Sequence, residues 1–469
     1  MEIAARLDAL NALTAAEFEQ LLTVLNIPIY LLPNGAQTVR AIEMIRYLSP
    51  RPGRLAELDR RLVEMQSRGT SPPAAVPPVP APVGQIPPGA AFQASVAYLY
   101  IPGLKDQRGG RIVKAMAALH RGIREVLAGE NGRWRGVRAL SALTGAIIVV
   151  PDDLNLHCHE LLTPICRALA TSNLPVRMGV SRGRFISAAD VDEEVNFLGR
   201  ALNVAARLAV AKENPGCLVH NDYARHAEPT LDESVWLVRG SQGYREEAVE
   251  GKAHDQPFQC VVAPADAYET TPAKPWDRLP EQANPRSLNA VVIAYDLPRF
   301  SGGEASELGS RFRGVADKFR ELRALNQIPE SVQLYFSPGG DGGIIALSGT
   351  DPARGYSVAE QFLHLLDVES QFRQKEIDVR CRIGIHYGQI SLYENAEGKL
   401  RPAGSTLFVA DEIAGDEIAR ERSEVIITEP LREAVGQIHV FQRDFERLAP
   451  LEKGPGQGIS RYARKAQHP

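Results

Sequence analysis

The sequence lacks any long apolar run, and this absence limits where the protein can act. It has no stretch of about 18 uncharged apolar residues, the length that a membrane-spanning helix needs. The N-terminus, Met1-Glu2-Ile3, also lacks the basic segment followed by an apolar one that is typical of a secretory signal. We therefore expect a cytoplasmic protein without a membrane span.

The chain also lacks a strong excess of charge and has few cysteines. Its formal net charge is -4, which gives no general attraction to nucleic acid or anionic lipid. The five cysteines form no Cys-x-x-Cys pair, so a structural zinc site is not indicated and reduced thiols are expected. The His157-Cys158-His159 run is a weak metal candidate, because neighbouring residues on a helix or strand point in different directions.

Proline-rich stretches divide the 469 residues, which are too many for a single core. Frequent proline removes backbone donors and favours an extended chain, which is typical of a linker. We place linkers at residues 70–91 and 266–287. They separate three units, at residues 1–69, 92–265 and 288–469.

The first unit has the periodicity of short amphipathic helices. Apolar residues recur three or four positions apart, so that each set lies on one helical face. Breaks that begin at Pro28, Pro33 and Pro50 stop the helices. The pattern predicts a small all-α bundle. The apolar sets are Phe18, Leu21, Leu22 and Leu25; Ala41, Met44, Ile45 and Leu48; and Leu55, Leu58, Leu62 and Met65.

This unit resembles the effector-associated, death-like adaptor domains of bacterial conflict systems. The resemblance depends on the apolar spacing and on the RAIEMI and GRLAEL runs, residues 40–45 and 53–58. It implies docking to a like domain of another protein. A dimerisation or packing bundle without an outside partner is the alternative.

The second and third units are copies of one plan. Four motifs recur in the same order, at offsets of 196, 197, 205 and 207 that rise slowly, as small loop insertions would cause. Each copy has the pattern strand, long helix, strand hairpin, helix, strand, helix, strand, which indicates an α+β domain with one sheet. The matched runs are 99–102 with 295–298, 144–148 with 341–345, 176–180 with 381–385, and 217–219 with 424–426.

Two acidic residues of the third unit stand where strands are expected to end. Asp296 follows a β-rich run, and Asp341 lies between two apolar runs that form a hairpin. Either residue alone is most simply explained as a helix cap or a turn residue. Together they can meet across neighbouring strands and hold two metal ions.

These acids, with the RIGIHYG run at residues 382–388, resemble the catalytic domain of class III adenylyl and guanylyl cyclases. The resemblance implies two α+β domains with a ferredoxin-like core, pairing head to tail after the death-like bundle. It also implies two Mg²⁺ or Mn²⁺ ions, with metal ligands at Asp296, Leu297 and Asp341.

The other half of the family's site is an asparagine and an arginine four residues apart on a helix. Asn203 and Arg207 of the first copy have this spacing, which puts them on one helical face. The resemblance implies that Asn203 orients the ribose and that Arg207 neutralises charge on the α-phosphate. A solvated polar stripe is the alternative, although asparagine is a poor helix former among such apolar neighbours.

Each copy lacks what the other has. The first copy carries Tyr100 and Thr144 where the metal ligands would be, and the second carries Phe408 and Glu412 in place of the asparagine and the arginine. Head-to-tail pairing, within one chain or between two chains, would therefore give one complete site and one dead site.

Recognition of the base is less defined. Asn196 stands seven residues before Asn203, where the resembled adenylyl cyclases carry an adenine-reading aspartate, and Arg138 or Leu140 lies in the region of their lysine. Because asparagine can both donate and accept hydrogen bonds, adenine, guanine, uracil and cytosine all stay open.

Three further residues are candidates for substrate binding by resemblance. Phe300 and Ser301 belong to the motif that begins at Asp296, and Lys252 stands near the family's late lysine that contacts the terminal phosphate.

The resemblance implies a nucleotidyl cyclase that converts a nucleoside triphosphate to a 3′,5′-cyclic nucleotide and pyrophosphate. With the adaptor unit, it suggests second-messenger signalling in bacterial defence. The alternative is an inactive pseudo-cyclase that senses a nucleotide and signals through the helical unit. A cyclic dinucleotide synthase, suggested by the glycine-rich run at residues 339–343, is less favoured because Asn203 and Arg207 have no role in it.

Overall fold

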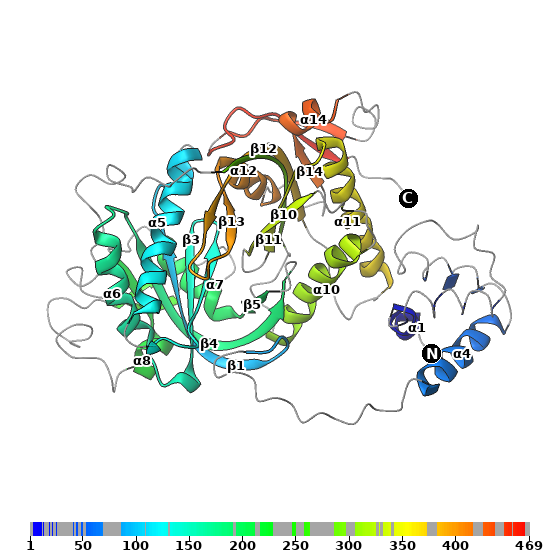
Figure 1. Ribbon diagram of the computed structural model, residues 1–469, viewed down its shortest axis with the longest axis horizontal. Helices are drawn as coiled ribbons and strands as arrows, with labels where there is room; N and C mark the ends of the chain where they lie inside the picture. Colours follow the sequence, from blue (N-terminus) through cyan, green and yellow to red (C-terminus); the bar gives the residue numbers. More distant parts are fainter. Residues whose placement is uncertain are drawn as a thin grey trace.

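The computed structural model describes the chain in segments, drawn in colour in Figure 1. Among these residues, no helix is long and apolar enough to cross a membrane. The described residues are 3–11, 13, 18, 21, 25, 41, 44–45, 48–49, 53–68, 86–107, 109–129, 132–190, 194–211, 216–227, 246–249, 258–262, 286–296, 305–324, 328, 332–338, 342–372, 382–415, 425–436, 445–452 and 454–464.

In the N-terminal unit, α1 (Ile3–Asn11) contacts α4 (Arg54–Arg68). Arg6 Nε donates a hydrogen bond of 2.7 Å to Asp59 Oδ1 across this contact. The members of the predicted apolar sets whose side chains the structure describes are buried, apart from Leu55, which is partly buried. The side chains of Leu22 and Met65 lie outside the described part. The predicted apolar faces are therefore confirmed for these residues, and docking to another protein stays a prediction. The buried positions are Phe18, Leu21, Leu25, Ala41, Met44, Ile45, Leu48, Leu58 and Leu62.

The next unit is built on one eight-stranded sheet, in the order β2-β3-β1-β4-β6-β8-β7, with β5 paired to β4. Its strands are β1 (Ala91–Tyr100), β2 (Arg138–Ala142), β3 (Gly145–Pro151), β4 (Arg177–Ala189), β5 (Val195–Leu198), β6 (Cys217–His220), β7 (Glu246–Val249) and β8 (Phe258–Val262). Its helices are α5 (Gly109–Ala128), α6 (Cys158–Ala170), α7 (Arg200–Val210) and α8 (Asn221–Ala227).

The last unit repeats this sheet in the order β10-β11-β9-β12-β14-β16-β15, with β13 paired to β12. The repeat predicted from the sequence is thus confirmed in the strand topology. Its strands are β9 (Ser287–Asp296), β10 (Gln333–Pro338), β11 (Gly342–Ser348), β12 (Arg382–Glu394), β13 (Leu400–Ala403), β14 (Val425–Thr428), β15 (Phe445–Leu448) and β16 (Arg461–Arg464). Its helices are α10 (Ala305–Ala324), α11 (Pro352–Phe372), α12 (Ser405–Ala414) and α14 (Glu429–Val435).

One part of the predicted repeat alignment is wrong by one residue. Met178 of β4 pairs with Cys217, whereas Ile383, its counterpart in β12, pairs with Val425. Cys217 therefore corresponds to Val425 and not to Glu424. Both short strands begin with three consecutive apolar residues, and such a run contains no alternation from which the register could be read.

Each sheet is covered by helices on both faces, which explains the continuous apolar runs in its central strands. Along β9, Val291 and Ile293 belong to one core cluster with residues of α10 and α11. The alternate residues Ala290, Val292 and Ala294 belong to another cluster with residues of α12. This two-residue period is that of a strand packed on both faces, and it brings the strand to its polar end at Asp296.

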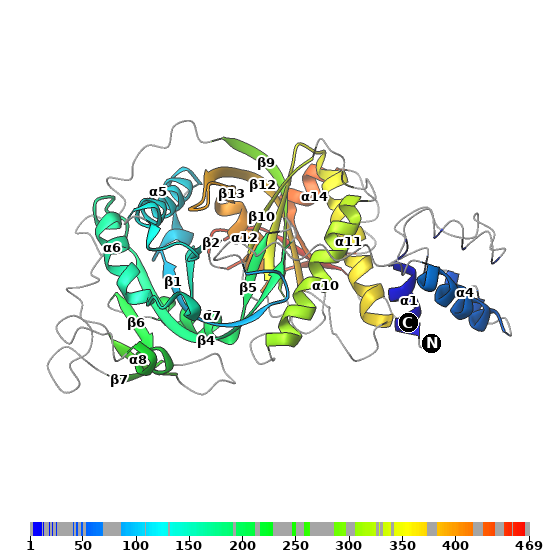
Figure 2. The ribbon, with the colours of Figure 1, turned by 60° about the horizontal axis from the view of Figure 1, so that its bottom comes forward.

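The two sheet units, called from here on the first unit (β1 to β8) and the second unit (β9 to β16), pack against each other reciprocally (Figures 1 and 2). Helix α5 of the first unit contacts β12 and β13 of the second, and α10 of the second contacts β4 and β5 of the first. The cores are shared accordingly. Ile186, Ala188 and Leu198 belong to the main cluster of the second unit, while Tyr393 and Phe408 belong to that of the first.

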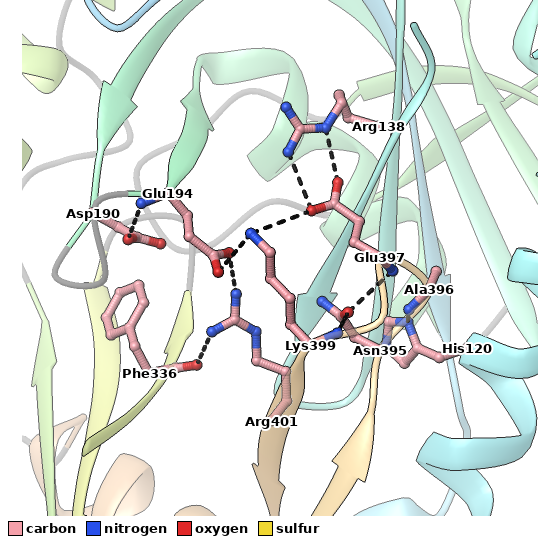
Figure 3. Close-up of polar contacts among 10 residues, drawn as sticks. All are labelled: His120, Arg138, Asp190, Glu194, Phe336, Asn395, Ala396, Glu397, Lys399 and Arg401. Carbon is pink, nitrogen blue, oxygen red and sulfur yellow. Dashed lines mark hydrogen bonds and ion pairs between the residues drawn. The ribbon is translucent and has the colours of Figure 1, made fainter. Parts of the chain in front are cut away.

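A chain of alternating charges crosses this contact (Figure 3). Arg138 donates to both carboxylate oxygens of Glu397, at 2.8 and 3.2 Å. Lys399 Nζ lies 2.6 Å from Glu194 Oε1, and Arg401 forms an ion pair with the same carboxylate. Exposed ion pairs contribute little to stability, but Arg401 is buried, so its pair with Glu194 fixes β13 against the first unit.

Two buried histidines make the stability depend on pH. Burial lowers the pKa of His386 to about 4 and that of His120 to about 3, below the ordinary value of 6.5. In the unfolded chain both titrate near pH 6.5 and would bind protons that the folded chain excludes. The free energy of unfolding is therefore not reduced by these histidines above about pH 6.5, and it falls as the pH falls towards 4. The loss is about 3 kcal/mol for His386.

Denaturant titrations between pH 7 and 4 would measure this loss. His386 Nδ1 lies 2.7 Å from the Thr428 hydroxyl, and His386→Asn can keep a hydrogen bond there without titrating. We expect the variant to show a flatter dependence of the unfolding free energy on pH, whatever its absolute stability. An unchanged slope would contradict the assignment to His386.

Candidate functional site

The end of β9 lies between two strands that both contribute to the candidate site. Asp296 is opposite Gly342 of β11 and opposite Arg382 of β12. A Cβ atom at Gly342 would lie 2.1 Å from the carbonyl oxygen of Tyr295, so only glycine permits the two strands to approach so closely here. Asp341 lies outside the described residues, but the residue that follows it is the direct partner of Asp296.

Arg382 forms an ion pair with Asp296, which the sequence analysis missed. The guanidinium Nη2 of Arg382 donates to Oδ2 of Asp296, and the two side chains are 13% and 24% exposed. The contact fixes the orientation of the carboxylate at the strand end. A signal was present in the sequence, because the first copy has Arg177 at the matching position, opposite Tyr100.

In the first unit, the corresponding strand end carries no acid. Tyr100 is opposite Gly145, which equates Tyr100 with Asp296 and Thr144 with Asp341, as the sequence alignment predicted. The Thr144 hydroxyl forms a hydrogen bond of 3.0 Å with the phenol of Tyr98. Burial raises the pKa of Tyr98 to about 12, so this phenol stays neutral and offers no anionic oxygen to a cation.

Helix α7 presents Asn203 and Arg207 one turn apart. Both are partly exposed, whereas Val204, Ala205 and Leu208 between and beside them are buried, so the two polar residues lie along the open side of the helix. The spacing predicted from the sequence is therefore present on a helix. Their roles at a phosphate and a ribose stay predictions.

A glycine in β4 determines how closely α7 approaches the sheet. A Cβ atom at Gly179 would lie 2.0 Å from the carbonyl oxygen of Ala205 and 2.6 Å from the amide nitrogen of Ala209. Gly384 of β12 has the same relation to α12, with 2.4 Å to the carbonyl oxygen of Ala410. The glycine of each matched motif thus allows a helix backbone to rest directly on the strand.

Helix α12 occupies the matching place in the second unit with different side chains. Phe408, the counterpart of Asn203, is buried and contributes to the core of the first unit. Glu412, the counterpart of Arg207, has its pKa raised chiefly by burial. The ammonium group of Lys105, from the turn after β1, lies 5.9 Å from the centre of the Phe408 ring and 3.9 Å from the Asp411 carboxylate. The end of β1 and α12 therefore face each other across the two units.

The two residues expected to read the base lie on β2 and β5. Asn196 is buried, and its side-chain oxygen accepts a hydrogen bond of 2.8 Å from the backbone N–H of Phe197. Arg138 pairs with Glu397, and its guanidinium carbon lies 5.9 Å from the centre of the Phe197 ring. Neither contact tests recognition of a base, which stays a prediction for both residues.

The remaining predicted site residues lie outside the described part of the chain. Among the described residues, no group of three or more histidine, cysteine, aspartate or glutamate side chains could hold a metal ion. Of the three predicted metal ligands, Asp296 is the one that lies among the described residues. Its carboxylate offers oxygen atoms, which are the ligands that Mg²⁺ prefers. The predicted residues outside the described part are Lys252, Leu297, Phe300, Ser301 and Asp341.

Comparisons with known proteins give matches among solved structures. No protein-family model and no curated protein matches the chain. A class III adenylyl cyclase-like ATP-binding protein from Pseudomonas aeruginosa is 15% identical, with 73% of this chain and 85% of that chain covered and a TM-score of 0.44. The adenylyl cyclase CyaB from P. aeruginosa is 13% identical, with 40% and 98% covered and a TM-score of 0.30. The guanylyl cyclase Cya2 is 13% identical, with 38% and 94% covered and a TM-score of 0.30. Identities this low say nothing about activity, which depends on the residues of the site.

The close contact between β4 and α7 can be tested with one methyl group. We expect Gly179→Ala to lower the free energy of unfolding by about 2 kcal/mol, because the added carbon overlaps the α7 backbone. Gly110→Ala in α5 is the matched control, since a Cβ atom there meets nothing within 4 Å. Denaturant midpoints measure both, and equal stability of the two variants would contradict the proposed contact.

Proposed function

We propose that this chain is a nucleotidyl cyclase with one composite site between its two sheet units. The observation that carries the proposal is a reciprocal loss at matched positions of two identical strand topologies. Asp296 ends β9 and Asp341 precedes Gly342 in the sequence, whereas Tyr100 and Thr144 stand at the matching positions of the first unit. The asparagine and arginine stand on α7 but not on α12. Random surface variation would not distribute these losses so that one full set remains.

The reciprocal packing supports a composite site. The turn after β1 faces α12 through Lys105 and Phe408. Because α5 and α10 make matching contacts on the opposite sheets, the same relation is expected between the end of β9 and α7. Asp296 would then lie across the contact from Asn203 and Arg207.

Each residue can be given a role in this arrangement. Asp296, Leu297 and Asp341 would hold Mg²⁺ or Mn²⁺, which when bound neutralises charge on a triphosphate and polarises a hydroxyl. Arg382 orients Asp296 and offers N–H donors to a phosphate oxygen. Arg207 would neutralise charge on the α-phosphate as that charge grows, and Asn203 would orient the ribose by hydrogen bonds.

The reaction needs little more from the protein than positioning. The 3′-oxygen forms a bond to the α-phosphorus, the bond from that phosphorus to the bridging oxygen breaks, and pyrophosphate leaves. The hydroxyl proton passes to solvent. In-line displacement of this kind depends on orientation and charge neutralisation, which few residues can supply.

Release of pyrophosphate from the four nucleoside triphosphates, with Mg²⁺ or Mn²⁺, tests the proposal. We expect Asp296→Asn, Asn203→Ala and Arg207→Ala each to lower the rate by about 100-fold or more. The matched controls are Tyr100→Phe and Glu412→Gln at the dead site, which should keep the activity. Absence of any pyrophosphate from the wild-type protein, or full activity of Asp296→Asn, would overturn the proposal.

Mixing two inactive variants tests whether the units pair within one chain. Asp296→Asn breaks the half-site of the second unit, and Arg207→Ala that of the first. If the units of one chain pair with each other, as the shared cores favour, the mixture stays inactive. If the units pair between chains, random association of the two variants makes about a quarter of the sites intact. Recovery of up to about a quarter of the wild-type rate would therefore indicate pairing between chains.

The ion pair between Arg382 and Asp296 favours a second candidate, an inactive pseudo-cyclase that senses a nucleotide. A carboxylate already paired with a guanidinium is a poorer ligand for a cation. This candidate binds nucleoside triphosphates in calorimetry but releases no pyrophosphate.

The helical unit gives either candidate a route to a partner. We infer that it docks to a like domain of a sensor or effector, and that the nucleotide product or bound nucleotide serves signalling in bacterial defence. Co-purification with a protein that carries such a domain would support this role. A chain shortened to the two sheet units should then keep pyrophosphate release but lose the partner.

A further inference from the structure

We propose, on the basis of the cyclase function above, that Asn196 donates a hydrogen bond to the base and thereby selects a base with an oxo group. Guanine and uracil carry an exocyclic oxo group, whereas adenine and cytosine carry an exocyclic amino group at the corresponding ring carbon. From the sequence alone, Asn196 could either donate a hydrogen bond to the base or accept one from it. Three observations indicate that it donates.

The first observation is the orientation of the carboxamide. The Asn196 side-chain oxygen accepts the backbone N–H of Phe197 at 2.8 Å. A backbone N–H can bond only to the oxygen end of the amide, so the two ends of this side chain cannot be exchanged. The acceptor of Asn196 is therefore already used within the protein.

The second observation is a buried donor without a partner. Asn196 is 3% exposed, and its Nδ2 has no hydrogen-bond partner among the described residues. Leaving such a buried group without a hydrogen bond destabilises the protein. A ligand atom that accepts a hydrogen bond at this point would recover that cost.

The third observation is the direction in which the side chain points. Asn196 shares its face of β5 with Leu198, two residues on, and lies opposite Ala188 of β4. Leu198 and Ala188 both pack in the main core cluster of the second unit, on the face of its sheet that α10 and α11 cover. The amide hydrogens of Asn196 therefore face the second unit across the contact.

Two carboxylates in this region are already paired with cations. Glu194, two residues before Asn196, is held by Lys399 and Arg401, and Glu397 is held by Arg138 (Figure 3). A base amino group next to Nδ2 of Asn196 would place donors against donors, whereas an oxo group would accept a hydrogen bond from Asn196.

Binding of 3′-deoxynucleoside triphosphates tests the inference, because these analogues lack the attacking hydroxyl and report on recognition alone. With Mg²⁺ and the full chain, we expect the guanine or the uracil analogue to bind at least about 10-fold more tightly than the adenine and cytosine analogues. In Asn196→Asp one oxygen can still accept from Phe197, and the other replaces the donor with an acceptor. This variant should weaken the preferred analogue by about 10-fold or more and favour an amino-bearing base.

Two controls keep the result specific. Gln389→Glu makes the same change from amide to carboxylate at an exposed position of β12 and should leave the order of the analogues unchanged. Asn196→Ala, which has neither donor nor acceptor, should remove the preference without reversing it. Thermal unfolding of each variant verifies that the fold is kept.

The outcomes separate this inference from the proposed activity. Tightest binding of the adenine or cytosine analogue, an unchanged order in Asn196→Asp, or no binding of any analogue would overturn the inference. Oxo-base preference together with no pyrophosphate from the natural nucleotides would support the donor role of Asn196 and reject the cyclase. Pyrophosphate release without any base preference would do the reverse.

Discussion

The reciprocal packing of two like sheets is the constraint on which the rest of the structure depends. Helix α5 covers β12 and β13, and α10 covers β4 and β5, so that each unit completes the core of the other. Removing either unit would expose apolar residues such as Leu198 or Phe408 to water. Neither copy can therefore be treated as a separate domain whose site is read in isolation.

Such packing explains how two copies of one plan could diverge without loss of the fold. The backbone requirements have been kept in both, as Gly179 and Gly384 illustrate, because a helix rests on the strand at each of them. The side chains at the two strand ends and on α7 and α12 differ between the copies. At one end Asp296 and Arg382 form an ion pair, and at the other a phenol and a threonine hydroxyl form a neutral contact. Two matched places in one fold now have opposite chemical character.

The same contact carries charge close to the position expected to read the base. Glu194 and Glu397 pair with basic residues, and the carboxamide of Asn196 has its oxygen bonded within β5. Arrangements of this kind make an interface selective, because a ligand group of the wrong polarity leaves a buried donor or acceptor unpaired. Selectivity for a base would then follow from how the two units are held together.

The sequence by itself determined the repeat, the strand ending at Asp296, and the helical spacing of Asn203 and Arg207, since these depend on local periodicity and turn residues. It misaligned Cys217 by one position, because a short apolar strand has no internal register signal. Only the tertiary structure brought Arg382 onto Asp296 and fixed the amide of Asn196. Those features depend on which strands become neighbours and on which backbone N–H groups remain unpaired, and neither is decided until the sheets have formed.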